Sequence, residues 1–144
     1  MKILALDFGE ARTGIAMCDE NELISYPLET IFEKDEIKLI EKINNVVILK
    51  KANMILVGLP LNMDGSEGKK AAICRNFAEK LKLKTNLPIA LWDERQTTKQ
   101  ALKYLINMNI KKNKKKNIID TISATIILDS FLQYKKNNSK INLI

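Results

Sequence analysis

The first few residues constrain the fold most, because the run from Ile3 to Leu6 is apolar at every position. Successive side chains of a strand point to opposite faces of a sheet, so this segment needs an apolar covering on both faces. Such a run is typical of a central strand between two layers of helices. Asp7 follows directly, and we therefore expect it at the rim of the sheet.

The next part of the chain predicts a meander of antiparallel strands. Gly9 and Gly14 punctuate a tight connection into the apolar run 15–18, and residues 23–31 supply a third extended segment. Pro27 within that segment fits an edge strand or a bulge, since proline cannot donate a backbone hydrogen bond.

The remainder alternates helical and extended patterns, which predicts parallel crossovers and an α/β fold. With 144 residues, the chain fits a single domain over residues 1–137, followed by a flexible tail at 138–144. The expected strands lie at 54–57 and 89–92, and the expected helices over 35–50, after Ser66, from Thr97 or Thr98 to about 106, and over 118–134. Ser66 and either Thr97 or Thr98 are the predicted helix caps. Ile37 is expected on the apolar face of the first helix, and Ile73, Phe77 and Leu81 on that of the second.

Composition excludes several kinds of chemistry. The chain has no histidine, so Ser-His-Asp triads, Cys-His pairs and histidine-rich metal sites cannot be formed within it. A formal net charge of +7 favours polyanionic partners, although a basic soluble protein without such a partner has the same charge. Cys18 and Cys74 follow no ligand spacing and predict reduced core thiols and a cytoplasmic protein. No run is long enough for a membrane span or a signal peptide.

Carboxylates at element ends are the remaining candidates for chemistry. Asp7 ends one apolar run, Asp93 and Glu94 end another, and Asp120 opens the last helical segment. Carboxylate oxygens are the ligands that Mg²⁺ and Mn²⁺ prefer. Simpler roles are open for two of them. Asp7 could form an ion pair with Arg12 or cap the turn, and Asp120 could lie in the first helical turn, where the helix dipole favours an acidic residue. Strand alternation lets only one of Asp93 and Glu94 point towards Asp7.

Several polar and basic residues near these carboxylates are candidates for binding phosphate. Arg12 presents a planar guanidinium, and the loop 58–68 leads to a helix N-terminus. A dense lysine run precedes Asp120 and predicts a basic loop that grips a nucleic-acid backbone, or simply a solvated one. The candidates for nucleic-acid binding are Arg12, Asn62, Ser66, Arg95, Thr97, Thr98, Lys112, Lys114, Lys115 and Lys116.

Four segments in order together resemble the YqgF/RuvX family. They are residues 4–16 (LALDFGEARTGIA), 57–66 (VGLPLNMDGS), 92–98 (WDERQTT), and Ile119-Asp120 with Ile127-Leu128 further on. The resemblance implies a ribonuclease H-like fold, with a mixed five-stranded sheet whose first three strands are antiparallel and with helices on both faces. Members are described as Holliday junction resolvases and as nucleases of pre-16S rRNA.

The same resemblance implies an acidic triad at Asp7, Glu94 and Asp120. These residues would hold Mg²⁺ or Mn²⁺, with two ions about 3.5–4 Å apart, and would hydrolyse a phosphodiester. The implied partner is nucleic acid, either an rRNA precursor or branched DNA, with the ribosome as a further partner and a monomer or homodimer as the assembly. Two other functions stay open: a nucleotide-binding module, and an RNA-binding ribosome-assembly factor without catalysis.

Overall fold

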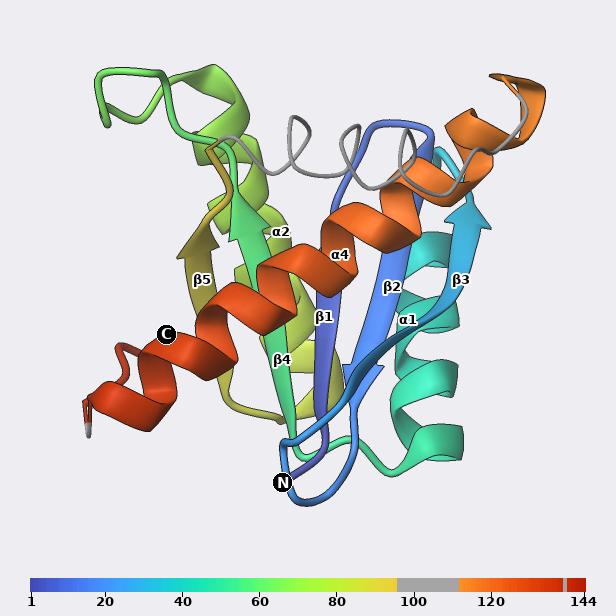
Figure 1. Ribbon diagram of the computed structural model, residues 1–144. Coiled ribbons are helices and arrows are strands. Elements are labelled where there is room, and N and C mark those ends of the chain that lie inside the picture. The colour runs from blue at the N-terminus through green and yellow to red at the C-terminus, as the bar shows by residue number, and fades with distance from the viewer. Residues whose placement is uncertain (96–111, 139) are drawn as a thin grey trace.

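The computed structural model describes residues 1–95, 112–138 and 140–144, with the backbone alone for 112–119. It has one five-stranded sheet in the order β3-β2-β1-β4-β5 (Figure 1). The strands are β1 (Ile3–Asp7), β2 (Arg12–Cys18), β3 (Ser25–Phe32), β4 (Met54–Leu59) and β5 (Ile89–Asp93). The described helices are α1 (Glu36–Lys50), α2 (Lys69–Thr85) and α4 (Lys112–Asn137).

The sheet is mixed, as predicted. β1 pairs antiparallel with β2, which pairs antiparallel with β3, whereas β4 runs parallel to both β1 and β5. Pro27 lies on the edge strand β3, opposite Ala16. Leu28, which follows it, is the extra residue where the register between β2 and β3 shifts, so the expectation of an edge strand or bulge is confirmed. The carboxyl ends of β1, β4 and β5 therefore meet at one edge of the sheet, the upper edge in Figure 1.

Helices cover both faces of the sheet because the central strands are apolar on both sides (Figure 1). Leu4 and Leu6 pack with buried residues of α1 and α2 on one face. Ile3 and Ala5 pack with α4 on the other face. The prediction from the first apolar run is thus confirmed, and β1 occupies the centre of the sheet.

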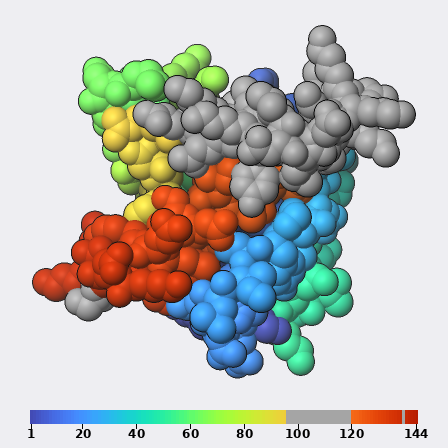
Figure 2. All heavy atoms as spheres, viewed as in Figure 1, coloured from blue at the N-terminus to red at the C-terminus, as the bar shows by residue number. Residues whose placement is uncertain are grey.

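Helix α4 crosses its face of the sheet diagonally and contacts β1, β2 and β3 (Figures 1 and 2). It already includes Lys112, so the prediction of a basic loop is wrong from that residue onward. Asp120 lies roughly two turns inside the helix and not in its first turn. The macrodipole explanation for Asp120 therefore fails, since that effect is confined to the terminal turn.

Three local predictions in the helices are also wrong. Ser66 does not cap α2; Gly68 holds that position, without a side-chain cap bond. Ile37 and Ile73, assigned from periodicity to buried faces, are 74% and 48% exposed. Helical spacing alone can misplace the edge of a buried face by one residue. The buried residues of α1 are Leu39, Ile40, Ile43 and Val47.

The last residues contact the sheet. Leu143 forms an antiparallel bridge with Ala90, and the Ile144 amide donates a hydrogen bond to the Ile89 carbonyl at 2.9 Å. Ile141 and Ile144 pack against the two apolar clusters. The segment predicted as a flexible tail thus has specific contacts with β5. No helix within the described ranges is long and apolar enough to span a membrane.

Candidate active site at the carboxyl edge of the sheet

Asp7 is the last residue of β1, and alternation directs it to the α4 side of the sheet. Ile3 and Ala5, which share its face, both pack against α4. Its register partner on β2 is Gly14. A buried strand thus delivers one carboxyl group to the edge of the apolar core beneath α4.

Glu94 brings the second carboxyl group from the end of β5. Its amide donates a hydrogen bond to the Leu59 carbonyl at 3.2 Å, which extends the pairing between β4 and β5 by one residue. The side chain passes over Gly58, where a Cβ atom would clash with the Glu94 carboxylate and with Ile127. Because glycine leaves this space, Glu94 reaches across β4 to Asp7 and forms a hydrogen bond with it.

Asp93 faces away from this pair. It accepts hydrogen bonds from the Arg95 amide at 2.9 Å and from the Arg95 guanidinium at 2.8 Å. The guanidinium lowers the pKa of Asp93. Of the two neighbouring acidic residues, Glu94 is therefore the one that the structure brings to Asp7.

Asp120 brings the third carboxyl group from α4. A Cβ atom at Gly14 would clash with the Asp120 backbone carbonyl, so glycine allows α4 to approach β2 at this position. Ala124, Ile127 and Phe131 are buried on the same helical stripe, which confirms the predicted inward direction of Asp120. Its side chain is 14% exposed.

Burial and mutual repulsion shape the charge of this site. Burial, the neighbouring Glu94 and, less strongly, Asp120 together raise the pKa of Asp7 to about 8. Burial also raises the pKa of Glu94 and of Asp120. Asp7 therefore holds the proton shared with Glu94 near neutral pH.

Arg12 forms an ion pair with Asp120. Among the described residues it forms none with Asp7, so the ion pair predicted between Asp7 and Arg12 is not found. The Arg12 Nε atom lies 3.3 Å from Asp120 Oδ2, and the guanidinium partly offsets the raised pKa of Asp120. That Oδ2 atom is buried and accepts no hydrogen bond within the described part of the chain. An electropositive ligand would satisfy it.

The loop between β4 and α2 stands beside this edge and is held by its own polar side chains. Asn62 donates to the Ser66 hydroxyl at 2.9 Å, and Ser66 donates to Asp64 at 2.6 Å. Gly65 adopts φ +88°, a conformation that favours glycine, and Arg95 donates to the Met63 carbonyl at 3.4 Å. Asn62 and Ser66 thus shape the loop, and Arg95 ties it to the end of β5.

Part of the predicted site cannot be placed. Thr97 and Thr98 lie outside the described residues, and for Lys112, Lys114, Lys115 and Lys116 only the helical backbone is described. Among the described residues, no three Asp, Glu, Cys or His side chains stand together at metal-ligand spacing. The donor set at this edge nevertheless suits a hard divalent cation, because it consists of carboxylates and the charges of Glu94 and Asp120 act against that of Asp7.

Sequence reasoning missed two contributions to this site. Gly58 appeared as the end of a strand, and its role in admitting Glu94 depends on the neighbouring strand β5. Lys70 on α2 lies close enough to lower the pKa of Glu94 against the effect of burial. The position of Gly58 at the start of the loop was the one available signal for its role. Nothing in the local pattern around Lys70 indicated that it would lie near Glu94.

Comparison with known proteins places these features in a family. The family model RuvX, described as "Holliday junction resolvase", matches residues 1–134. A Carboxydothermus hydrogenoformans protein named "Putative pre-16S rRNA nuclease" is 36% identical, with 96% of this chain and all of that protein covered. A Protochlamydia amoebophila protein with the same name is 40% identical, over 91% of this chain and 92% of that protein.

Two solved structures share the fold at low sequence identity. Thermus thermophilus RuvC in complex with a Holliday junction substrate has a TM-score of 0.63 and 11% identity, with 99% of each chain covered. The fowlpox virus resolvase with its Holliday junction DNA has a TM-score of 0.61 and 12% identity, over 94% of this chain and 99% of that one. The predicted ribonuclease H-like fold is thereby confirmed, and by the extent of the family match this chain belongs to the RuvX family.

Proposed function

We propose that this chain is a metal-dependent endonuclease that hydrolyses phosphodiester bonds at the 5′ end of pre-16S rRNA. The observation that carries the proposal is the convergence of Asp7, Glu94 and Asp120 at one edge of the sheet in a chain of this family. The names of the similar proteins supply the substrate. Cytoplasmic action, on RNA alone or within a ribosomal particle, belongs to the same proposal.

Asp7, Glu94 and Asp120 would hold Mg²⁺ or Mn²⁺, in a site for one or two ions. These carboxylates would hold the ion, which when bound would supply an activated water molecule and stabilise charge on the leaving oxygen. The Asp120 Oδ2 atom is buried and has no hydrogen-bond partner among the described residues, and this supports the assignment, as do the raised pKa values of Asp7 and Glu94. The shared proton must leave Asp7 before that carboxyl group can act as an anionic ligand.

The chain's own cations would position the substrate. Arg12 stands beside Asp120 and can hold a phosphate through its planar fork. The candidate contacts further along the chain are Arg95, Thr97, Thr98, Lys112, Lys114, Lys115 and Lys116. Such contacts fix the backbone of the nucleic acid without reading its sequence. Asn62 and Ser66 would act by holding the loop 60–68 in shape.

A second candidate function is the resolution of Holliday junctions. The description of the family model favours it. A symmetric junction presents two equivalent scissile strands, so this activity calls for a homodimer, whereas trimming of rRNA is possible for a monomer. The oligomeric state in solution, measured by light scattering with and without each substrate, bears directly on this choice.

The test incubates wild type, Asp7→Asn, Glu94→Gln and Asp93→Asn with a precursor-like single-stranded RNA and with a synthetic four-way DNA junction. Each reaction contains Mg²⁺, Mn²⁺ or EDTA. We expect metal-dependent cleavage by wild type and by Asp93→Asn, and a loss of about a thousandfold or more in Asp7→Asn and Glu94→Gln, because each removes an anionic group from the reaction centre. The preferred substrate decides between the two activities.

Asp93→Asn is the matched control because Asp93 adjoins Glu94 and points to the other face of the sheet. Equal losses in Asp93→Asn and Glu94→Gln would contradict the assignment of Glu94. Tight RNA binding without cleavage by folded wild type would favour a non-catalytic assembly factor instead, and ATP binding would favour a nucleotide-binding module.

A further inference from the structure

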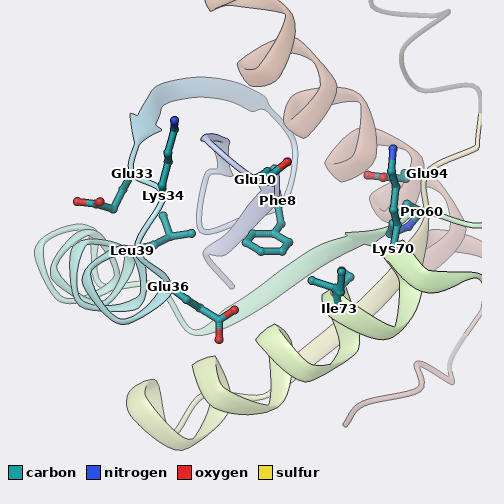
Figure 3. Close-up of a pocket in the computed structure, with 12 residues that line it drawn as sticks. Phe8, Glu10, Glu33, Lys34, Glu36, Leu39, Pro60, Lys70, Ile73 and Glu94 are labelled. Carbon is teal, nitrogen blue, oxygen red and sulfur yellow. The ribbon is translucent and has the colours of Figure 1, made fainter.

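A pocket of about 580 Å³ opens on the other face of the sheet from α4, beside the candidate active site (Figure 3). This volume lies within the range of about 300–1,000 Å³ that is usual for small-ligand sites. Its apolar wall is formed by Phe8, Leu39 and Ile73. Glu94 also lines it, so the pocket and the carboxylate site share a side chain.

The apolar wall is firmly supported. Phe8 stacks on Phe77 with ring centroids 4.0 Å apart and planes 7° apart. Phe77 and Leu39 are buried in the core, while Ile73 is half-exposed at the opening. A flat apolar group entering the pocket therefore meets a surface already fixed in position, and little ordering is needed on binding.

The charges around the pocket are unevenly neutralised. Glu33 and Glu36 are paired with Lys42 and Lys80, at 2.9 Å and 2.7 Å. The two lysines on the lining, Lys34 and Lys70, form no ion pair or hydrogen bond among the described residues, although Lys70 lies close enough to lower the pKa of Glu94. Figure 3 shows them on opposite sides of the pocket.

A ligand that suits this lining has a flat, partly apolar body and an anionic backbone. Phe8, Leu39 and Ile73 would contact the body, and Lys34 and Lys70 would contact phosphates on either side. Glu10, also on the lining, can accept hydrogen bonds from amino and imino groups at the edge of the body. A nucleotide within a strand has all of these features.

We propose that this pocket holds one unpaired nucleotide of the substrate strand, next to the phosphodiester at Asp7 and Glu94. The proposal rests on the nuclease function proposed above. The nucleotide must be unpaired because a base inside a duplex cannot leave its stack to enter a pocket without losing its pairing. The pocket therefore selects single-stranded segments, bulges or ends next to the cleavage point.

The test measures binding in EDTA, so that cleavage does not interfere. Fluorescence anisotropy compares a single-stranded RNA of about 12 nucleotides with an abasic sugar-phosphate strand of equal length. The variant Ile73→Trp fills the opening, and Leu83→Trp is its matched control on the same helix, since Leu83 is 81% exposed and outside the pocket. We expect Ile73→Trp to weaken binding of the intact RNA about fivefold or more and to leave binding of the abasic strand unchanged.

Two further variants test the apolar wall at Ile73 and the predicted phosphate contact of Lys70. Ile73→Asp replaces the apolar contact by a charge that repels phosphate and should also weaken binding of the intact RNA, without added bulk. Lys70→Ala should reduce the slope of log affinity against log salt by about one, because one phosphate contact is lost. Lys69→Ala, one residue earlier and off the pocket, should change that slope less. Circular dichroism confirms that each variant is folded.

Equal weakening for intact and abasic strands in Ile73→Trp, or none for either, would overturn the pocket assignment. Metal-dependent cleavage by wild type in that case would leave the nuclease function standing. Selective loss of intact RNA in Ile73→Trp, with no cleavage by wild type under any metal, would support the pocket and refute the nuclease.

Discussion

The two faces of the sheet are alike through most of their height and differ at the carboxyl edge. Both carry a continuous apolar cluster, one against α1 and α2 and the other against α4. At the edge, Phe8 completes the first face by stacking on Phe77, whereas Asp7 completes the second by meeting Glu94. Asp7, the last residue of β1, and Phe8, which follows it in the chain, thus complete the two apolar clusters in opposite ways.

The aromatic stack on one face and the carboxyl groups on the other have opposite effects on the stability of the core. An aromatic stack adds apolar contact and strengthens the core. Buried carboxyl groups weaken it, and their presence needs space that two glycines provide, Gly14 under α4 and Gly58 beneath Glu94. The α4 face thus accommodates buried carboxyl groups at a cost in stability, and such a cost is common at functional sites.

The largest effect should come from the apolar face. Phe77→Ala removes a fully buried ring and its stack with Phe8, and should lower the free energy of unfolding by about 3–5 kcal/mol. Urea denaturation measures this loss. Leu83→Ala, at an exposed position on the same helix, should change it little. If both variants were equally stable, the stack would not anchor this face.

Gly14→Ala should be the most damaging small change on the α4 face. Its added methyl group clashes with the Asp120 backbone, so α4 must shift, at a cost of about 1–3 kcal/mol. Denaturation and nuclease assays on the folded variant should both report losses. Gly68→Ala is the control, since the nearest described atoms to its methyl group belong to the flexible Asn62 side chain, at 3.3 Å. A stable and fully active Gly14→Ala protein would show that the approach of α4 is not needed.

Removing the charge of Asp7 should stabilise the fold at high pH. The pKa of Asp7 is about 8 in the folded protein, against an ordinary value of 3.8 for an aspartate side chain in water. A raised folded pKa contributes stability that is present below pH 4 and is lost as pH rises through 8. We therefore expect Asp7→Asn to equal wild type near pH 4 and to become increasingly more stable than wild type as the pH rises towards 9.

Thermal melts of the two proteins from pH 4 to pH 9, in EDTA, give this difference directly. Asp93→Asn should behave in the opposite way, because Arg95 lowers the pKa of Asp93 and its charged form therefore stabilises the fold above pH 4. A constant difference between wild type and Asp7→Asn over this range would refute a buried, protonated Asp7.

The smallest effect on stability should follow from Arg95→Ala. Its ion pair with Asp93 is partly exposed, with side chains 36% and 38% accessible, and such pairs add little to stability. The variant also loses the contact with the Met63 carbonyl, so the loop 60–68 should be cut faster by a nonspecific protease. Mass spectrometry of the fragments locates the cut. Lys42→Ala, which breaks the ion pair with Glu33, should leave proteolysis of this loop unchanged.

Much of the fold was predictable because it depends on alternation along single segments. The apolar run at Ile3–Leu6 predicted a central strand, and Pro27 predicted the edge. Helix limits were less predictable: the lysine-rich segment from Lys112 gives no apolar period, yet it continues α4 towards its N-terminus. Its helical backbone is fixed by the downstream turns that pack on the sheet, since propagation is easier than nucleation.

The sequence by itself determined which chemistry is available: carboxylates without histidine, an excess of lysine, and acidic residues at the ends of strands. Only the tertiary structure decided between Asp93 and Glu94, paired Arg12 with Asp120, and made Gly58 the passage through which Glu94 reaches Asp7. The reason is physical. Residue type fixes the donors and charges, whereas distance and burial depend on strands and helices that are far apart in the chain and meet only in the folded core.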